Sequence, residues 1–318
     1  MKIIDILDQA TEPLISYEII PPFRGKSAKV IYDIVDELIG FHPPFIDVTS
    51  HAADALFLEQ KDGSFKKKVQ RKRPGTLGLC AAIKYRYNVE TVPHLLCRGF
   101  TRQETEDALI ELSYLGIDNV LAVTGDEKHT PSKRADGRRR NKLSLELLQQ
   151  IVRMNNGEYE EGILDSSESN FCIGVGGYPE KHPESPNLEQ DIQYLKEKVL
   201  AGADYIVTQV FFNNVDYFNY VDLCRSHDID IPIIPGIKLI TKQSQIKSLP
   251  KHFYIDIPDD FVKAMTDSKS ERESAEIGLE YALKQCEELM AANVPALHFY
   301  VMQDVKHIKK IVSTLRKH

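Results

Sequence analysis

The amino-acid sequence predicts an α/β fold, a single (β/α)8 TIM barrel, from three observations. Eight short runs rich in β-branched and aromatic residues alternate with longer segments of helical period along the 318 residues. Parallel strands need crossover helices, and eight of them close into a packed barrel. No repeat, linker or low-complexity tract divides the sequence. Residues 1–318 are therefore predicted to form one catalytic barrel domain, with no regulatory domain.

Each expected strand is short and stops at turn residues or prolines. In chain order the strands span residues 14–20, 45–50, 91–97, 119–125, 171–179, 205–211, 231–240 and 296–302. A doubly wound open sheet is the alternative, but no GxGxxG turn follows the first strand. The polar residues of interest are also spread over all the strands, which favours the barrel.

Amphipathic helices are expected between the strands. Residues 27–41 have Ser27 as a candidate N-cap and one apolar stripe, and residues 187–202 have a second stripe. The first stripe consists of Val30, Ile31, Ile34, Val35, Leu38 and Ile39, and the second of Leu188, Ile192, Leu195 and Val199.

A third helix, over residues 101–116, has signals at both ends. Thr101 followed by Glu104 is a capping-box signature, in which each side chain binds the backbone N–H of the other residue. Gly116 is a typical residue for the position after a helix. The helix is therefore expected to begin after Thr101 and to end before Gly116.

Composition and charge exclude several classes of protein. The formal net charge of −7 argues against duplex nucleic acid or an anionic membrane as the main partner, because both require a cationic face. The N-terminus lacks a signal-peptide pattern, and no window resembles a membrane span. Five scattered cysteines without CxxC spacing predict neither a disulfide framework nor a zinc site, and no metal is expected. A cytoplasmic location fits these features.

A basic, polar segment, residues 127–142, follows the fourth expected strand. One interpretation is a solvated loop. The other is a lid or a contact for ligand phosphates, and the sequence does not decide between them.

One carboxylate, Glu18, interrupts an apolar strand that stops at Pro21-Pro22. By alternation it shares a face with Ser16 and Ile20, and in a TIM barrel the inward side chains near the end of a strand line the active site. A buried carboxylate needs a raised pKa or a neighbouring cation. Glu18 is thus a candidate general acid, and a structural ion pair with a lysine or arginine is an equally good interpretation.

Other polar residues lie near the ends of expected strands. Gln209 needs hydrogen-bond partners inside its strand, which a ligand with donor and acceptor edges would supply. Asp126 follows Gly125 where the fourth strand stops, a pattern that also fits ordinary turn chemistry. Thr49 and His94 are polar exceptions of the same kind, although a lone strand histidine is more often a core residue.

The segment after the fifth strand suits a nucleotide. Residues 176–185 combine glycines and prolines with an aromatic ring, Tyr178, and an imidazole, His182. The helix that follows has a carboxylate, a ring and a cation on one face, although a solvated helix face is the alternative. These three residues are Asp191, Tyr194 and Lys198.

Eight segments, taken in order, resemble one family. They are SYEIIPP, DVTSHAA, TVPHLLC, NVLAVTGD, VGGYPEKHPES, DIQYLKEKVLAGADYIVTQVFF, IPIIPGI and LHFYVM. Together they resemble methylenetetrahydrofolate reductases of the bacterial type, flavin-dependent barrel enzymes of one-carbon metabolism and methionine biosynthesis. The resemblance implies non-covalent FAD that takes a hydride from NAD(P)H and reduces 5,10-methylenetetrahydrofolate to 5-methyltetrahydrofolate. It also implies self-association into a homo-oligomer.

The resemblance also implies a role for each matching position. Glu18 corresponds to the acid that assists opening of the substrate ring to an iminium cation, and Asp126 to the carboxylate that stabilises this cation. The implied substrate site comprises Gln209, Gln245 and Tyr300. The implied cofactor site comprises Thr49, His94, Thr124, Gly125, Asp126, Tyr178, His182, Asp191, Tyr194 and Lys198.

Three positions depart from the family pattern. Thr124 stands where bacterial members often have arginine, Leu249 where some have a stacking aromatic ring, and Gln303-Asp304 where an Asn-Arg pair occurs. The changes concern contacts with the cofactor, the nicotinamide nucleotide and the glutamate tail of folate, respectively. The sequence does not distinguish NADH from NADPH.

Two other functions are consistent with the same residues. The main alternative is a pterin- or folate-binding barrel without a redox cofactor, such as a methyltransferase or synthase. A non-enzymatic folate-binding or scaffold protein is the second, and it predicts that Glu18→Gln keeps full function.

Overall fold

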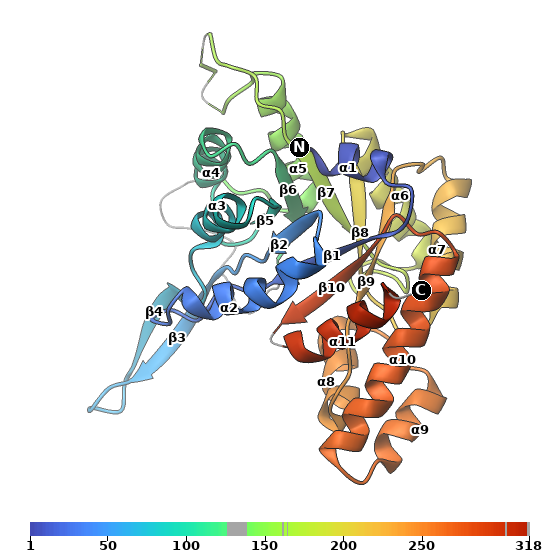
Figure 1. Cartoon of the computed structure of the whole chain (residues 1–318). Coiled ribbons are helices and arrows are strands. Elements are labelled where there is room, and N and C mark those ends of the chain that lie inside the picture. Colours follow the sequence, from blue (N-terminus) through green and yellow to red (C-terminus); the bar gives the residue numbers. More distant parts are fainter. Residues whose placement is uncertain (126–138, 161, 164, 303, 317–318) are drawn as a thin grey trace.

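The computed structural model describes residues 1–125, 139–160, 162–163, 165–302 and 304–316. Its centre is a closed barrel of eight parallel strands in the order β1-β10-β9-β8-β7-β6-β5-β2 (Figure 1). The barrel prediction is confirmed. The open-sheet alternative is wrong, because β1 pairs with both β10 and β2 and therefore leaves no free edge.

All eight expected strands form. They are β1 (Leu14–Ile19), β2 (Phe45–Val48), β5 (Glu90–Leu96), β6 (Asn119–Val123), β7 (Cys172–Gly177), β8 (Tyr205–Val210), β9 (Ile233–Ile237) and β10 (Ala296–Met302). The expected run at residues 231–240 is longer than β9, because residues 238–240 are buried without belonging to the sheet.

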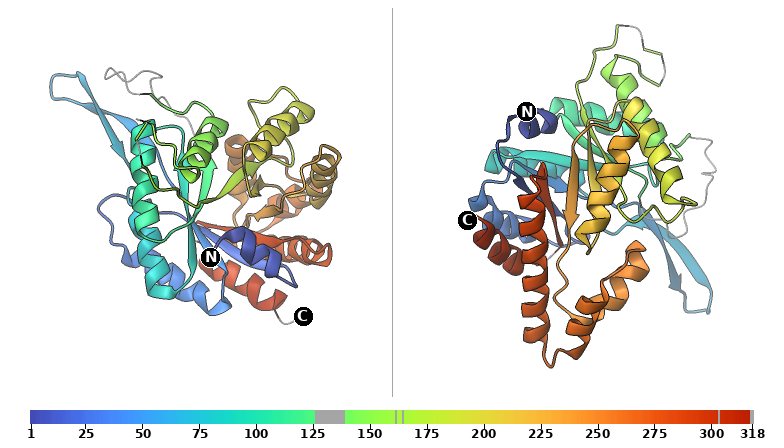
Figure 2. Two further views of the ribbon diagram at one scale, coloured as in Figure 1. Left: turned by 90° about the horizontal axis from the view of Figure 1, so that it is seen from above. Right: turned by 90° about the vertical axis from the view of Figure 1, so that its right-hand side faces the viewer.

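Helices surround the barrel (Figure 2). They are α2 (Lys29–Leu38), α3 (Thr76–Tyr87), α4 (Arg102–Tyr114), α5 (Ser144–Asn155), α6 (Leu188–Leu200), α7 (Asn214–Ser226), α10 (Glu271–Ala291) and α11 (Val305–Leu315). Outward strand residues such as Tyr17 and Ile19 pack with inward helix residues such as Ile31 and Val35 in the main hydrophobic core. This layer carries most of the apolar burial that stabilises the fold.

The expected helix signals are largely confirmed. At the start of α4, Thr101 Oγ1 accepts from Glu104 N at 3.1 Å, and the Glu104 carboxylate accepts from Thr101 N at 2.8 Å. The apolar stripe of α2 is wrong at Val30, whose side chain is 45% exposed. Ser27 Oγ accepts from Lys29 N, but the N-cap position itself is Ala28.

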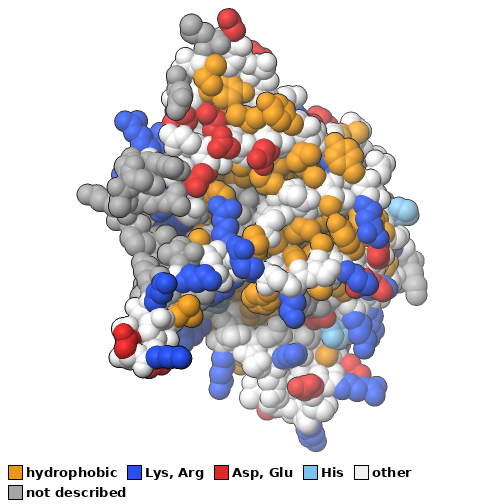
Figure 3. All heavy atoms as spheres, turned by 90° about the vertical axis from the view of Figure 1, so that its left-hand side faces the viewer, with side chains coloured by type: hydrophobic (Ala, Val, Ile, Leu, Met, Phe, Trp, Pro, Cys, Tyr) orange, Lys and Arg blue, Asp and Glu red, His pale blue; other side chains and the backbone are white. Residues whose placement is uncertain are grey.

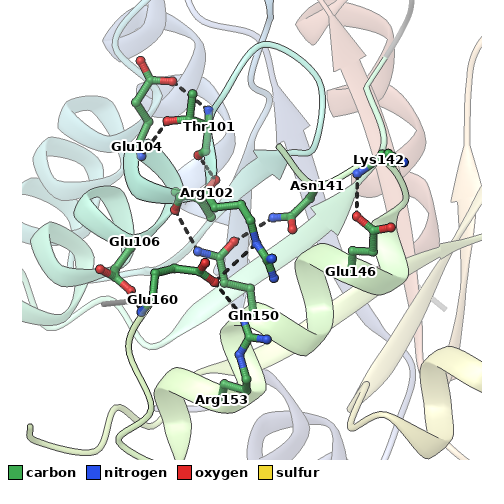
Figure 4. Close-up of polar contacts among 11 residues, drawn as sticks. Thr101, Arg102, Glu104, Glu106, Asn141, Lys142, Glu146, Gln150, Arg153 and Glu160 are labelled. Atoms are coloured by element: carbon green, nitrogen blue, oxygen red, sulfur yellow. Dashed lines mark hydrogen bonds and ion pairs between the residues drawn. The ribbon is translucent and has the colours of Figure 1, made fainter. Parts of the chain in front are cut away.

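Polar contacts join α4, α5 and the segment after α5 on the outside of the barrel (Figure 4). Glu160 forms ion pairs with Arg102 and Arg153, and Gln150 Nε2 donates to the Arg102 carbonyl. Asn141 in turn donates to Gln150 Oε1. These contacts fasten the chain on both sides of residues 126–138, which lie outside the described residues.

The amino-terminal end of the barrel is closed by α1 (Ile3–Gln9). Ile3 and Leu7 pack against interior residues such as Phe45 and Tyr205. In Figure 1, α1 lies at the end of the barrel opposite to α8 and α9. The carboxyl end of the barrel is therefore the end that can receive a ligand.

A two-stranded antiparallel hairpin was not expected. It consists of β3 (Ala53–Glu59) and β4 (Phe65–Arg71), and it projects from the barrel in both views of Figure 2. Asp62-Gly63 at its turn, with Gly63 at φ +79°, is a turn signal that could have indicated it. The alternation of side chains in its strands is weak, which explains the omission.

On the other side of the mouth, α8 (Gln243–Phe253), α9 (Asp259–Asp267) and α10 form a helical extension (Figure 1). Its own apolar cluster consists of Val210, Phe212, Ile240, Leu249, Ile255, Phe261 and Met265. Gly278 allows α10 to approach the backbone of Ile240, since a Cβ atom there would lie 1.7 Å from the Ile240 carbonyl oxygen. The segment after β9 is thus held firmly beside the mouth. Among the described residues, no helix is both long and apolar enough to cross a membrane.

Candidate active site

The inward polar side chains at the carboxyl end of the barrel lie at one level. Glu18 of β1 is in register with Tyr300 of β10 on one side and with Asp47 of β2 on the other. His298 and Phe299 of β10 pair with Gly236 and Ile237 of β9, so the next residue after β9, Lys238, comes level with Tyr300. The closed register therefore collects acids and a lysine from four neighbouring chain segments.

Glu18 is buried at this level, with 9% of its surface exposed. Its Oε2 atom lies 3.6 Å from His94 Nε2, and the same nitrogen lies 3.3 Å from Asp47 Oδ2. Burial lowers the pKa of His94, and the Glu18 carboxylate opposes that change. The structure thus brings together two residues predicted from the sequence, Glu18 and His94.

Beside Glu18, the barrel interior contains further polar residues that the sequence interpretation missed. Asp47 is fully buried, and burial raises its pKa to about 7, while His298 acts in the opposite direction. His298 Nδ1 lies 2.8 Å from Ser16 Oγ, and burial lowers the pKa of this histidine. Asp47 shares the inward face of its strand with Phe45, so it is a polar exception of the kind that marked Glu18.

Lys238 brings a cation to the site, and it was also missed. Its side chain is 8% exposed, and Nζ donates to the Tyr300 carbonyl oxygen at 3.2 Å. Burial lowers its pKa to about 8, against the opposing influence of Asp304 and Glu18. A lysine inside the apolar run of residues 231–240 was the available signal.

The predicted substrate residues Tyr300 and Gln209 lie on β10 and β8, the two strands on either side of β9. The Tyr300 hydroxyl donates to the Thr208 carbonyl at 2.6 Å, and burial raises its pKa well above the usual range. Gly236 makes this contact possible, since a Cβ atom there would lie 2.5 Å from the Tyr300 ring. Gln209 Oε1 accepts from Val210 N at 2.9 Å.

Three of the predicted cofactor residues form one cluster after β7. The rings of Tyr178 and His182 meet edge to face with centroids 4.5 Å apart. Asp191 Oδ2 accepts from His182 N at 2.9 Å, and Oδ1 accepts from the Ser185 hydroxyl at 2.8 Å. Burial lowers the pKa of His182. Asp191 of α6 therefore holds the turn at residues 178–185 in place, so that its rings have a fixed position for a ligand.

The two remaining residues of α6 have different surroundings. Burial lowers the pKa of Lys198, while Asp191 and Cys97 act in the opposite direction, so Lys198 belongs with the cluster electrostatically. Tyr194 is 46% exposed. Asp191 and Lys198 therefore interact on one face of α6, as expected. Tyr194, the expected ring of that face, lies at the surface.

Other predicted cofactor residues follow β2 and β6, the two strands on either side of β5. Thr49 N donates to the Ile19 carbonyl, and Thr49 Oγ1 is buried without a hydrogen-bond partner among the described residues. Arg98 N donates to the Thr124 carbonyl, and Arg98 Nη1 donates to the Gly125 carbonyl at 3.4 Å. Gly125 has φ +85°, which favours glycine.

Some predicted positions cannot be placed. Asp126, residues 127–138 of the basic segment and Gln303 lie outside the described residues. Gln245 is described, and its Oε1 accepts from Thr241 N and Lys242 N at the start of α8. Leu249 is buried in the apolar cluster of the helical extension.

A cavity of about 230 Å³ opens beside the mouth, between the hairpin, α3 and α4. Its lining includes two arginines, two histidines and a threonine, namely Arg71, Arg73, His51, His94 and Thr76. Arg73 stacks on Phe23 and donates to the Pro21 carbonyl, which links the cavity to the loop after β1. Lys and Arg side chains are prominent on the face that carries the hairpin (Figure 3).

These features define a (β/α)8 barrel protein with a candidate active site at the carboxyl end of its barrel. The family model of methylenetetrahydrofolate reductase matches residues 2–316. The chain belongs to the methylenetetrahydrofolate reductase family, as the sequence resemblance predicted.

Curated relatives agree with this assignment. Methylenetetrahydrofolate reductase 1 of Schizosaccharomyces pombe is 30% identical over 99% of this chain and 48% of its own length. The Arabidopsis thaliana protein named methylenetetrahydrofolate reductase (NADH) 1 is 29% identical, over 95% and 48%. The chain therefore spans about half the length of these relatives. It spans 90% of the 5,10-methylenetetrahydrofolate reductase of Salmonella typhimurium, at 26% identity over 95% of this chain.

One solved structure has the same fold over nearly the whole length. It is an uncharacterized protein from Clostridium thermocellum, described as binding two copies of 5-methyl-5,6,7,8-tetrahydrofolic acid. The TM-score is 0.57 and the identity 11%, with 98% of both chains covered. At this identity the likeness supports the fold alone.

Proposed function

We propose that this protein catalyses the FAD-dependent reduction of 5,10-methylenetetrahydrofolate to 5-methyltetrahydrofolate, with NADH or NADPH as the donor. The observation that carries the proposal is Glu18, a nearly buried acid at the mouth of a family barrel, 3.6 Å from His94. A proton donor in that position is what opening of the substrate ring requires.

The chemistry of the donor set fits FAD. The buried hydroxyl of Thr49 lacks a partner among the described residues, and a polar ligand at the mouth would supply one. Lys198 and the Tyr178–His182 ring pair would hold the ribityl and phosphate groups, and His94 would face the ring system. When bound, FAD transfers a hydride from the nicotinamide nucleotide to the folate.

In the proposed reaction, Glu18 holds a proton and donates it to N10 of the folate. Its burial excludes water, which strengthens electrostatic interactions at the reacting centre. The Gln209 amide and the Tyr300 ring would orient the pterin. Asp126 would stabilise the iminium cation, as its position in the family motif implies. For Gln245 the amide nitrogen would make the substrate contact, since its oxygen caps α8.

Further parts of the proposal concern the protein as a whole. The described residues would act as one catalytic barrel domain, and copies of the chain would associate into a homo-oligomer. Thr124, Gly125 and Tyr194 would contribute to the cofactor site from its rim.

The absorbance spectrum of the purified protein tests the proposal. We expect flavin bands, either as purified or after reconstitution with FAD. Anaerobic NADH or NADPH should bleach these bands, and 5,10-methylenetetrahydrofolate should restore them. A colourless protein that does not bind FAD would overturn the proposal and favour a pterin-binding barrel without redox chemistry.

A further inference from the structure

Lys238 occupies a position that apolar packing alone does not explain. It directly follows β9 at the mouth, next to Tyr300, which is itself in register with Glu18. Its Nζ atom donates to the carbonyl of Tyr300 at 3.2 Å, and its side chain is buried. A buried ammonium is costly to desolvate, so its retention indicates a nearby negative charge that it stabilises.

Two carboxylates face Lys238 from different elements. Glu18 comes from β1, and Asp304 comes from the start of α11, where Thr241 Oγ1 donates to its Oδ2 at 3.2 Å. Asp304 is also paired with His307. The imidazole of His94 also lies near Glu18. Burial lowers the pKa of His94, which favours its neutral form. Lys238 therefore brings a positive charge near enough to act on Glu18.

We propose that Lys238 is a positioning residue for the proton donor, and that its ammonium group stabilises the carboxylate formed when Glu18 gives its proton to the folate. This inference rests on the proposed function. In the step, the O–H bond of Glu18 breaks and an N10–H bond forms. The bond from N10 to the methylene carbon then breaks, its electron pair stays on N10, and the N5 lone pair completes the iminium. No oxidant is needed.

The proposal predicts a particular pH dependence. Lys238 is charged below about pH 8 and loses its charge above that value, because its pKa is lowered to about 8. The benefit of the ammonium group should therefore be present at neutral pH and disappear in alkali. The other titratable groups at the mouth, namely Glu18, Asp47, His94, His298, Tyr300 and Asp304, are present in all Lys238 variants. The titration of Asp304 and Glu18, which interact with Lys238, should shift with its charge, so a ratio between variants measures the lysine together with this coupling.

The first experiment compares Lys238→Met and Lys238→Arg with the unaltered protein. The measured quantity is the rate at which methylenetetrahydrofolate reoxidises the reduced flavin, divided by the rate of flavin reduction by NADH. At pH 7 we expect this ratio to fall by up to about tenfold in Lys238→Met for each pH unit by which the Glu18 midpoint rises, and to be largely rescued in Lys238→Arg, because a weaker acid gives up its proton less readily. Lys247→Met, at an exposed position of α8, is the matched control.

The pH profile separates this role from a structural one. The difference between the unaltered protein and Lys238→Met should shrink as the pH rises above about 8. The difference between Lys238→Arg and Lys238→Met should persist, since arginine stays charged. A loss that is the same at every pH, or that arginine does not rescue, would overturn the proposal.

A second readout needs no turnover. Infrared difference spectra should contain a carboxyl band that is absent in Glu18→Gln. In Lys238→Met the titration midpoint of this band should rise by about one pH unit or more, because the carboxylate loses its counter-ion. An unchanged midpoint would contradict the coupling of Lys238 to Glu18 even in an active enzyme. A shifted midpoint in a protein that binds no flavin would keep the coupling and reject the proposed function.

Discussion

At the scale of single residues, two acids inside the barrel, Glu18 and Asp47, have different surroundings. Glu18 lies at the mouth, 3.6 Å from His94, and interacts electrostatically with Lys238. Asp47 lies one strand away, fully buried, and its pKa is raised to about 7. We therefore propose Glu18 as the proton donor, whereas Asp47 lies next to it on β2 and contacts His94.

The raised pKa of Asp47 predicts how stability depends on pH. The unfolded chain loses this proton near pH 4, but the folded protein keeps it until about pH 7. Its contribution to stability is therefore complete below pH 4 and declines as the pH rises to 7. Asp47→Asn stays neutral throughout, so the difference in unfolding free energy between the two proteins should change by up to about 4 kcal/mol between pH 4 and pH 8.

Urea denaturation of both proteins at several pH values measures this difference. Because Asp47 interacts with His94 and His298, the comparison measures Asp47 together with its coupling to these two histidines. Parallel stability curves for the unaltered protein and Asp47→Asn would contradict a buried, neutral Asp47.

At the scale of single residues, the sequence indicated the acid at the mouth, Glu18, but it did not indicate most of the polar residues that surround Glu18. Glu18 and His94 were identifiable as polar exceptions in apolar strands. Asp47, Lys238 and His298 were missed, because their partners come from other strands and are set by closure of the barrel. Local alternation predicts which way a side chain points, but it does not predict what it meets across the barrel.

At the scale of elements, two adjacent glycines of β7 have different roles. A Cβ atom at Gly177 would lie 2.4 Å from the Tyr220 hydroxyl of α7 and 2.7 Å from Ile206. A Cβ atom at Gly176 would have its nearest neighbour at 4.0 Å, on Tyr178. Gly177 therefore allows α7 to pack closely against the strand, whereas Gly176 leaves space on the inner face.

This difference gives a matched pair of substitutions. Gly177→Ala should lower the free energy of unfolding by roughly 1–3 kcal/mol, because a well-packed contact must shift. Gly176→Ala should change it by less than about 0.5 kcal/mol. Chemical denaturation of the two variants checks the prediction, and equal effects would refute the assigned directions of the two side chains.

The elements themselves were mostly predictable, and the failures have physical reasons. The capping box of α4 is local, and its prediction was confirmed. The β3–β4 hairpin was missed, because its strands lack a strong apolar alternation and pair only with each other. The stripe of α2 was wrong at Val30, since a helical period of 3.6 residues does not fix the exact edge of the buried face.

For the molecule as a whole, the number and order of the parallel strands follow from the sequence, and the closed register gathers the site. The helical extension of α8, α9 and α10 on one side and the hairpin on the other flank the same mouth (Figure 1). Neither could be placed from the sequence, because each packs through contacts distant along the chain. The proposed function depends on one acid at this mouth, Glu18.

Anaerobic stopped-flow of the unaltered protein and Glu18→Gln, loaded with FAD, tests that account most directly. The substitution keeps the size of the side chain and removes its transferable proton. We expect reduction of the flavin by NADH to proceed in both proteins, and reoxidation by 5,10-methylenetetrahydrofolate to be at least about a hundredfold slower in Glu18→Gln. Equal rates of reoxidation in the two proteins would contradict the assignment of Glu18 as the proton donor.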